Sequence, residues 1–588
     1  MNKILSLTAL SSIMTGGIWL ELATVVQGNQ SLFLSYPSDN HQTTASQIFF
    51  IGSGSLDTNI SINGEVVNLS SQGYFAPSFS LEMGENIFII RQGNQEIKRT
   101  IIRTSGQPAT PQGVAFGENS LTPKVDIARL PGELVCFGAI APTDATVSVQ
   151  IGSEDIPLFP QDLNTNLPPN YAALTAESST DTATIANQYQ GCNSFSQPGS
   201  LGQPLYQMSL NGETVTQQSS GQIEILVPDQ LQTVEITTVA GVARTGPSTN
   251  YSRLTPLPQG TRASVIGQEG EWLRLDYGAW IKQGETRSLP GVIPPQSLIR
   301  SIISRQVPDA TEIIFPLQMP VPVSVEQGEK AFTLNLYNLT AQTDIIRLDD
   351  DPIVKRLDWQ QVTPSQVRYT FNLKSEQQWG YQLRYEGNNL ILSLRHPPSI
   401  SKNSLEGINI LIDPGHGGEE LGARGPNGLP EKEVNLIISK LLKQELTARG
   451  AKVYMTRETD IDVSLGDRVK AINELQPTLA LSVHYNALPD SGDALNTAGI
   501  GMFWYHAQAH DLAVHMHNYL VNNLNRPSYG IFWDNLALTR PHSAPTLLME
   551  LGFMINPEEF EWLTNPQEQE KLAQAIAEGI SVWLHKQN

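Results

Sequence analysis

The sequence predicts a multidomain protein in which several small all-β modules precede a C-terminal α/β domain, whose mixed sheet is covered by helices on both faces. Three observations support this fold class. The chain has 588 residues, more than one compact domain usually holds. Before residues 397–398, short alternating apolar and polar runs are separated by turn residues, as in β-strands. After them, strand-length apolar runs alternate with longer segments of helical period.

The composition restricts the possible functions. Apolar residues make up 40% of the chain and charged residues 16%, which is typical of folded domains rather than of long disordered proteins. The formal net charge is −21, so the chain has no excess of positive charge for a phosphate backbone. We therefore expect no nucleic-acid partner.

The N-terminus predicts export. In residues 1–30, Lys3 precedes a mostly apolar run and a polar stretch follows, which is the order of a secretory signal peptide. No clear small-residue cleavage site follows the run, so a retained N-terminal membrane anchor is the alternative, and only that alternative implies contact with a membrane. The expected location is the periplasm or cell envelope. Cys136 and Cys192 would form a disulfide or remain two buried thiols; the sequence does not decide between them.

The first two predicted regions are rich in β-structure. Residues 46–103 contain short alternating runs with an Asn63-Gly64 turn, and this pattern resembles Ig-like modules of bacterial surface enzymes. Residues 104–240 contain only two basic residues, Lys124 and Arg129, in a background of Ser, Thr, Gln, Pro and Asn. We expect this second region to combine strands with irregular linker.

Two further β modules are predicted before the α/β domain. Residues 241–285 resemble a bacterial SH3-like cell-wall targeting module, with Trp272 and Trp280 as its aromatic residues. These tryptophans either pack a small barrel core or face a wall ligand. Residues 310–398 again contain strand-like runs and resemble a β-sandwich module that localises some cell-wall enzymes.

The α/β domain is expected at 406–588, where strands and helices alternate. The predicted strands are 408–412, 452–456, 479–483, 501–505 and 546–550, and the predicted helices are 433–449, 467–474, 509–524 and 567–584.

Four residues with metal-binding or acid–base side chains occur at strand ends or at a helix start in this domain. His416 follows a strand in the turn Asp413-Pro414-Gly415-His416-Gly417-Gly418, whose glycines permit close approach to the histidine. Glu431 opens a helix, and His484 and Glu550 end apolar strands. Sites in α/β sheets lie beyond the carboxyl ends of strands, so we expect these side chains to converge.

Two histidines and one carboxylate form a known zinc set that leaves a position open for water, while a second carboxylate can act as general base. His416, Glu431 and His484 fit the first role, and Glu550 fits the second. Each residue alone also has a structural interpretation, because a histidine at a strand end is often only hydrogen-bonded and a glutamate at a helix start often serves the helix dipole.

Taken together, the motifs resemble those of zinc-dependent N-acetylmuramoyl-L-alanine amidases, which hydrolyse peptidoglycan. The resemblance covers about 408–584 and includes the turn 413–418, Gly422-Ala423, Glu431-Lys432, Thr456-Arg457 with Asp460, Leu465-x-x-Arg468, and the segments 482–487, 535–538 and 550–559. It implies Zn²⁺ as the cofactor, zinc ligands at His416, Glu431 and His484, Glu550 as the catalytic residue, and peptidoglycan as the substrate. No long insertion lies between 487 and 501, so the occluding helix that some members carry there is expected to be absent.

Other polar residues are weaker candidates. Asp413 would orient His416 through its second ring nitrogen, or simply form the turn before Pro414. Arg540 would face the substrate or lie on the surface. Two further groups are predicted not to bind metal: His506, His510, His515 and His517 lack a metal-binding pattern, and Glu458-x-Asp460-x-Asp462 lacks the glycine and closing glutamate of a calcium loop.

Two rival functions remain at this stage. The chain would be a non-catalytic wall-binding scaffold or amidase regulator if its α/β domain were inert, but the full set of four site residues argues against this. It would be a zinc peptidase if it cut within the stem peptide. The sequence leaves open whether a protein activator is needed.

Overall fold

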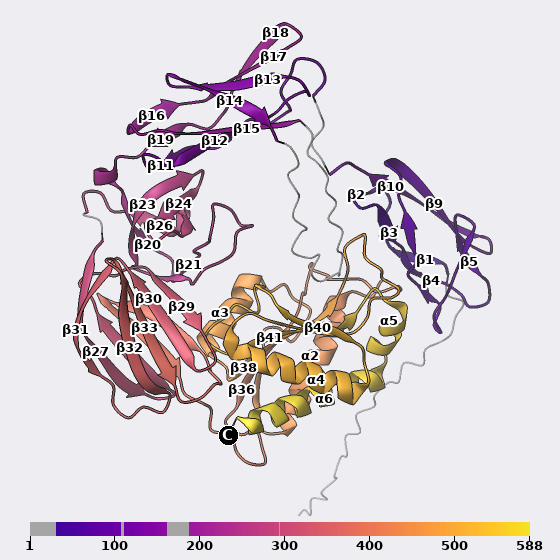
Figure 1. Ribbon diagram of the computed structural model, residues 1–588. Coiled ribbons are helices and arrows are strands. Elements are labelled where there is room, and N and C mark those ends of the chain that lie inside the picture. The colour runs from indigo at the N-terminus through magenta and orange to yellow at the C-terminus, as the bar shows by residue number, and fades with distance from the viewer. Residues whose placement is uncertain (1–30, 107–110, 162–186, 293–294, 588) are drawn as a thin grey trace, which may run out of the picture.

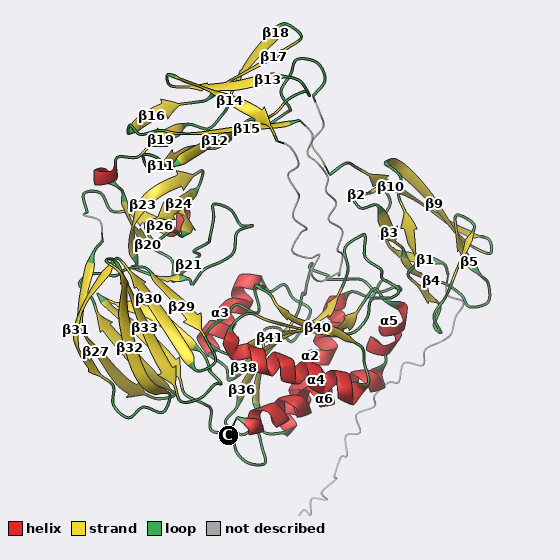
Figure 2. Ribbon diagram, viewed as in Figure 1, coloured by secondary structure: helices red, strands yellow, loops and turns green. Residues whose placement is uncertain are grey.

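The computed structural model describes residues 31–106, 111–161, 187–292 and 295–587 (Figure 1). The predicted signal peptide at 1–30 lies outside these ranges. Within them, no helix is long and apolar enough to cross a membrane. Figure 2 shows that the α-helices gather in the C-terminal domain, whereas the preceding modules are built mainly of strands and loops.

The N-terminal module is a small β domain that begins before its predicted start at 46. Its sheets have the orders β1-β4-β7, β2-β10-β9-β5-β6 and β3-β8. Asn63 and Gly64 have φ values of 47° and 87°, as a two-residue hairpin turn between β5 and β6 requires. The strands are β1 (Phe33–Tyr36), β2 (His41–Thr43), β3 (Gln47–Phe49), β4 (Ile51–Ser53), β5 (Ile60–Ile62), β6 (Glu65–Val67), β7 (Tyr74–Phe75), β8 (Ser78–Ser80), β9 (Gly84–Gln92) and β10 (Gln95–Arg103).

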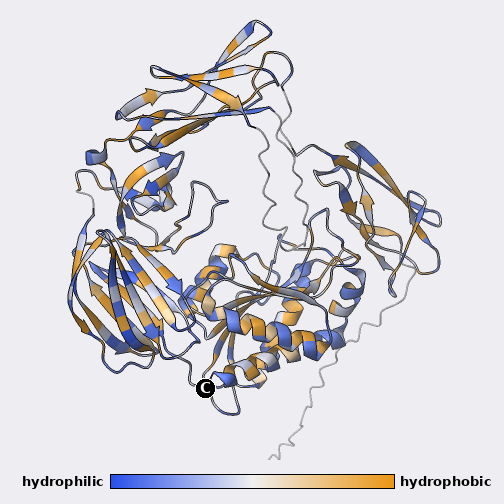
Figure 3. Ribbon diagram, in the orientation of Figure 1, coloured by the Kyte–Doolittle hydropathy of each residue, from blue (hydrophilic) through white to orange (hydrophobic). Residues whose placement is uncertain are grey.

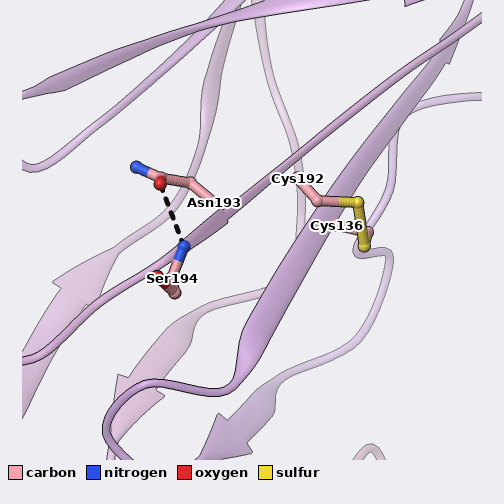
Figure 4. The surroundings of a disulfide bond; sticks show 4 residues. All are labelled: Cys136, Cys192, Asn193 and Ser194. Carbon is pink, nitrogen blue, oxygen red and sulfur yellow. Dashed lines mark hydrogen bonds between the residues drawn. A yellow bond between two sulfur atoms is a disulfide. The ribbon is translucent and has the colours of Figure 1, made fainter.

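The second module contains a six-stranded antiparallel sheet of order β12-β15-β14-β13-β17-β18. Cys136 on β12 lies opposite Cys192 on β15, and the two form a disulfide (Figure 4). The strands are β11 (Ile127–Arg129), β12 (Leu134–Ile140), β13 (Thr146–Ile151), β14 (Glu154–Pro160), β15 (Gln188–Ser194), β16 (Gly199–Gly202), β17 (Leu205–Leu210), β18 (Glu213–Gln218) and β19 (Ile223–Ile225), followed by the 3-10 helix η1 (Pro228–Gln230).

The third module is joined to the second by hydrogen-bonded strands. Its strand β20 lies before the predicted start at 241 yet pairs with β23 and β26, and β11 of the second module pairs with β23. The result is one sheet of order β16-β19-β11-β23-β20-β26, with β24 and β25 attached. The elements are β20 (Thr233–Ile236), β21 (Ala240–Gly241), β22 (Leu257–Pro258), β23 (Arg262–Glu269), β24 (Trp272–Leu275), β25 (Trp280–Lys282), η2 (Gln283–Glu285) and β26 (Thr286–Ser288).

The fourth module is a β-sandwich that starts at β27, before the predicted boundary of 310. Its two sheets have the orders β31-β27-β28-β35-β34 and β29-β30-β33-β32. Alternate residues of β33 are buried, which places one face of this strand in the core between the sheets. The strands are β27 (Ser297–Val307), β28 (Ala310–Pro316), β29 (Val323–Gln327), β30 (Ala331–Tyr337), β31 (Leu339–Arg347), β32 (Val354–Thr363), β33 (Gln366–Leu373), β34 (Tyr381–Glu386) and β35 (Asn389–Arg395).

The C-terminal domain has the predicted α/β architecture. Its sheet has the order β37-β36-β38-β41-β39-β40, in which only the β39–β41 pairing is antiparallel. The elements are β36 (Asn409–Pro414), α2 (Glu431–Ala448), β37 (Lys452–Met455), α3 (Leu465–Leu475), β38 (Leu479–Asn486), β39 (Ile500–Trp504), η3 (Ala507–Ala509), α4 (His510–Leu524), β40 (Ser528–Trp533), β41 (Thr546–Phe553), α5 (Pro557–Leu563) and α6 (Pro566–Lys586).

Two apolar cores lie on the two faces of this sheet. Helices α2, α4 and α6 contribute to the larger core, and α3 contributes to the smaller one. Figure 3 shows hydrophobic and hydrophilic residues interspersed along α4 and α6, as expected for helices with one buried face.

The N-terminal module and the β-sandwich both pack against the C-terminal domain (Figure 1). Phe49 and Ile51 of the N-terminal module share an apolar cluster with Phe553 and Ile555. From the sandwich side, the ring of Tyr381 stacks on His542 with their centroids 4.5 Å apart. The sheet edge that carries the site therefore lies in a domain contacted by modules from both the beginning and the middle of the chain.

Candidate functional site

The four predicted site residues meet at one edge of the sheet, formed by the carboxyl ends of its parallel strands. His416 follows β36, His484 lies near the end of β38, and Glu550 lies in β41. These three strands are parallel neighbours, and the register pairs His484 directly with Glu550. Glu431 is the first residue of α2. The folding of adjacent parallel strands thus brings together residues that are up to 134 positions apart in the sequence.

His416, Glu431 and His484 present their ligand atoms to one another. Within the ranges that the structure describes, they are the only group of three or more potential ligands whose atoms all lie within 4.8 Å. Glu431 Oε2 lies 3.1 Å from His416 Nε2, and Glu431 Oε1 lies 3.1 Å from His484 Nδ1. The two imidazole rings are nearly perpendicular, with an interplanar angle of 81°. One carboxylate is therefore held between two imidazoles.

Two glycines make room for this arrangement. A Cβ atom on Gly415 would lie 2.1 Å from the ring of His484, and one on Gly422 would lie 2.4 Å from Glu431 Oε2. Gly422 also has a φ of 69°, which favours glycine. These positions explain why the turn after β36 needs residues without side chains.

Burial and mutual contacts set the electrostatics of the three residues. Burial alone would raise the pKa of Glu431, but its hydrogen bonds to His416 and His484 outweigh burial and bring the pKa well below its usual range. Burial alone would lower the pKa of His484, but Glu431 raises it to about 9. Burial alone would likewise lower the pKa of His416, but its contact with Glu431 raises it. The group thus has the character of a carboxylate stabilised between two proton-sharing imidazoles.

Glu550 has a different environment. Its Oε2 atom is buried and has no hydrogen-bond partner in the protein. Burial raises the pKa of this carboxyl to about 7, although the nearby His484 opposes the shift. A carboxyl with such a pKa can take up and release a proton near neutral pH, which is the requirement for a general base.

Of the two alternatives for Asp413, contact with the ring of His416 is not observed. The two carboxylate oxygens of Asp413 accept hydrogen bonds from Thr456, Ser482 and Arg468. The ring nitrogen Nδ1 of His416 instead lies 3.0 Å from Glu420, an exposed residue that sequence reasoning missed. Asp413 acts on His416 indirectly, because the Arg468 that it binds also donates to the backbone carbonyl of His416 at 2.7 Å.

The glycine turn is held by further cations. Arg457 is buried and donates to the carbonyls of Pro414, Gly415 and Lys432. Lys432 donates to the carbonyl of Gly418 and to Asp460. Asp460 therefore helps to fix the turn through Lys432. It lies in the segment Glu458-x-Asp460-x-Asp462, which the sequence predicts not to bind calcium. The motif Thr456-Arg457 was the available sequence signal for Arg457, but it did not reveal which groups the guanidinium would contact.

The remaining candidates lie elsewhere. Arg540 comes before the start of β41, at the edge of the sheet opposite Glu550, so it does not face the cluster of His416, Glu431 and His484. Of the four other histidines, His506, His515 and His517 bond to Arg540, Gly579 and Ser528 respectively, and His510 contacts the ring of Trp504. They form no cluster.

Trp272 and Trp280 are both buried. Arg244 and Lys282 lie over the ring of Trp272, and Arg129 and Arg274 lie over that of Trp280. Neither tryptophan therefore presents an open face, which favours the packing alternative over a ligand-facing role.

The donor set fits a metal ion such as Zn²⁺. Two imidazole nitrogens and one carboxylate oxygen are suitable ligands, and they already converge. The unpartnered Oε2 of buried Glu550 beside them requires a partner that the protein itself does not supply.

Residues 487–499, which follow the strand of His484, form a loop without a helix.

Comparisons with known proteins locate a domain match at this site. The family model described as N-acetylmuramoyl-L-alanine amidase matches residues 410–582. A probable cell wall amidase LytH of Staphylococcus epidermidis is 31% identical over 195 residues, which are 33% of this chain and 64% of the relative. A probable cell wall amidase LytH of Staphylococcus aureus is 32% identical over 185 residues, covering 31% and 60% respectively. The chain thus spans somewhat less than two thirds of these curated relatives.

Among solved structures, the N-acetylmuramoyl-L-alanine amidase AmiC2 of Nostoc punctiforme is 30% identical to this chain. The match covers 32% of this chain and 99% of that protein, with a TM-score of 0.29.

Proposed function

Residues 410–582 form a domain of the N-acetylmuramoyl-L-alanine amidase family, and from this premise we propose that the protein is a zinc-dependent peptidoglycan hydrolase. It would cleave the amide between the lactyl group of N-acetylmuramic acid and L-Ala of the stem peptide. The observation that carries the proposal is the convergence of His416, Glu431 and His484 beside the buried, unpartnered carboxyl of Glu550.

In this proposal, His416, Glu431 and His484 hold Zn²⁺, which when bound polarises an amide carbonyl and makes water more acidic. Glu550 accepts the proton of the attacking water on its carboxylate and returns it to the leaving amine of L-Ala. One water is consumed, the amide bond breaks, and a lactyl carboxylate and a free amine result. The raised pKa of Glu550 suits a group that must take and give a proton in each cycle.

The protein would act on the cell wall after export. The disulfide between Cys136 and Cys192 supports an oxidising compartment, where such bonds persist. The β modules that precede the amidase domain would bring it to its insoluble substrate.

The substitution Glu550→Gln tests the catalytic role. The variant should bind one zinc ion per chain by elemental analysis, because the three ligands are intact, and should release no stem peptide from purified peptidoglycan. Wild-type protein should yield peptides with new L-Ala amino termini in mass spectrometry, and a chelator should abolish them. Glu433→Gln, which changes an exposed carboxylate on the first turn of α2, is the matched control and should digest normally.

The digest also separates the rival functions. New reducing sugar ends with intact amides would refute amidase activity. Cleavage that exposes an amino terminus within the stem peptide would identify a peptidase. Binding without any cleavage, with wild-type protein loaded with zinc, would identify a scaffold.

A further inference from the structure

A large cleft lies where three modules meet, away from the zinc-ligand cluster. Its volume is about 820 Å³. Its walls come from the third module at 240–256 and 277–279, from β29 of the sandwich, and from the C-terminal domain at α3, the end of β39 and the segment 533–542. None of the four residues of the proposed active site lines it.

The cleft contains two arginines without carboxylate partners. Arg253 and Arg540 both line it, and within the described residues neither makes an ion pair. Burial lowers the pKa of Arg540 to about 10, and the charges of Arg253 and Arg244 add to this shift. Glu326 is the one lining carboxylate, and it is exposed and accepts a hydrogen bond from Asn335. The Arg540 guanidinium donates to the carbonyl and side-chain oxygens of Asn535. Like charges are thus crowded here without a carboxylate ion pair, in a chain whose net charge is −21.

Several other arginines of the second and third modules have carboxylate partners. Four of the guanidinium groups around their shared sheet each form an ion pair with a glutamate: Arg129 with Glu269, Arg262 and Arg287 with Glu235, and Arg274 with Glu133. Among the described residues, Arg244 of the third module also lacks a carboxylate partner, but it lies outside the cleft lining and donates to the carbonyls of Thr249 and Tyr251. Arg253 and Arg540 thus differ from these four ion-paired arginines.

The cleft also contains a hydroxyl group that has no hydrogen-bond acceptor in the part of the chain that the structure describes. The hydroxyl of Tyr277 lines it and is buried without a hydrogen-bond partner in the protein. The ring of Tyr277 packs on Tyr337, with centroids 4.9 Å apart, so the hydroxyl is held in place. Buried polar groups are normally satisfied, so an unsatisfied donor beside two unpaired arginines points to an external acceptor.

An exposed aromatic ring lies at the same cleft. Trp533 is 61% exposed, and its indole nitrogen donates to the carbonyl of Tyr505 at 2.9 Å. Its ring also packs on that of Tyr505, with centroids 5.1 Å apart. A large ring that is fixed yet open to solvent offers an apolar face to a ligand at little entropic cost.

We propose that this cleft binds a carboxylate-bearing glycan–peptide strand of the cell wall, with Arg253 and Arg540 engaging its carboxylates and Trp533 packing on a sugar ring. The choice of a wall polymer rests on the proposed function, whereas the need for an anionic, acceptor-rich ligand follows from the cleft itself. Tyr277 donates its hydroxyl to the same ligand.

The binding site is distinct from the catalytic edge. Strand β39 is antiparallel to β41, and Gly501 pairs with Glu550. Tyr505 lies four residues further along, or roughly 13 Å along the sheet, towards the opposite edge. A strand held in the cleft would therefore keep the enzyme on the polymer while the catalytic edge remains free for another segment.

The test measures retention on purified peptidoglycan sacculi, with all proteins in a Glu550→Gln background so that the polymer is not digested. Arg253→Gln should raise the apparent Kd about tenfold, the loss expected for one charge-assisted hydrogen bond. Trp533→Ala should weaken binding similarly, and since this side chain is exposed its removal should not disturb folding. Arg300→Gln, an arginine on β27 that does not line the cleft, is the matched control and should bind as the parent does.

A second arm separates carboxylate recognition from sugar packing. A neutral oligomer of N-acetylglucosamine should bind more weakly than the sacculi, and only binding to sacculi should weaken with added salt. Equal retention of Arg253→Gln and Arg300→Gln, or equal affinity for the neutral glycan, would overturn the proposal. The digestion experiment reports separately on the proposed function, because the retention differences do not depend on bond cleavage.

Discussion

Arg468 shows how a single buried side chain can determine the shape of the turn that carries His416. It forms an ion pair with Asp413 at 2.6 Å, and both side chains are 3% exposed. The same guanidinium donates to the carbonyls of Pro414 and His416. His416 has a φ of 58°, in the left-handed region that a non-glycine residue adopts only when its surroundings enforce it. Arg468 supplies one such restraint.

We expect Arg468→Met to destabilise the C-terminal domain by about 3–5 kcal/mol, because it leaves the buried carboxylate of Asp413 without its cation. Native-state hydrogen exchange of the β36 and β38 amides would measure this loss. Zinc affinity, measured by competition with a chelator, should also fall by about 10- to 100-fold, since the support of His416 is weakened.

The matched control for this prediction is Arg449→Met. Arg449 pairs with Glu445 one turn away on α2, and that carboxylate is 39% exposed. Its loss should cost less than about 1 kcal/mol. Similar effects of the two substitutions would show that the loss of stability does not depend on burial of the Asp413–Arg468 pair.

The individual site residues were predictable from the sequence to different degrees. His416, Glu431, His484 and Glu550 each stand at a strand end or helix start, so their convergence follows from the topology of a parallel sheet. The partners of Asp413 were not predictable in this way. They come from three different elements, and no local spacing reports which side chain meets a carboxylate.

At the level of elements, long and strongly apolar segments were predicted best. The core strands and the helices α2, α4 and α6 lie within a few residues of their expected bounds. The sequence pattern did not predict β40 and α5. β40 is an edge strand whose residues are only partly buried, so it lacks a continuous apolar run. α5 has seven residues and begins at a proline, too short to show a helical period.

The turn between β36 and α2 makes a further prediction. Gly415→Ala would place a methyl group 2.1–2.5 Å from three atoms of the His484 ring, so either the ring or the turn must move. We expect the variant to lose stoichiometric zinc binding, as measured by elemental analysis after dialysis, while it retains its secondary structure by circular dichroism.

Gly466→Ala serves as the comparison for this variant. Gly466 lies in the first turn of α3, and an added Cβ there meets nothing closer than 3.7 Å. It should bind zinc as the parent does. Full zinc occupancy of Gly415→Ala would mean that the close approach of the turn to His484 is not required.

At the scale of the whole molecule, contacts distant in sequence decide how the modules are arranged. The hydroxyl of Tyr36 donates to Asp490, which lies 454 residues away in the loop after the strand of His484, and His41 contacts the same carboxylate at 2.9 Å. The sequence pattern within a single module does not reveal contacts between modules. The sequence could therefore predict β-rich modules ahead of an α/β domain but not the cleft among three of them, which depends on Arg253 and Arg540 coming together.

The contact between the sandwich and the C-terminal domain contains two half-buried histidines, which also line the cleft. Burial lowers the pKa of His506 to about 4 and that of His542 to about 3. Both flank Tyr381 of the sandwich, and the Tyr381 amide donates to the carbonyl of His542. When this contact opens and the rings become hydrated, each histidine regains a pKa of about 6.5 and binds a proton below that pH. Acid should therefore weaken the contact.

For His542 the full contribution is present above pH 6.5 and is lost progressively as the pH falls towards 3, because only the opened state is protonated in that window. At pH 5 the loss amounts to about 2 kcal/mol. We expect His542→Gln, which cannot titrate, to reduce the acid sensitivity of the Tyr381 amide by about this amount between pH 7 and 5, as measured by hydrogen exchange. Amides of β9 and β10 in the N-terminal module are the internal control and should be unchanged. An identical pH slope in parent and variant would exclude His542 as the source.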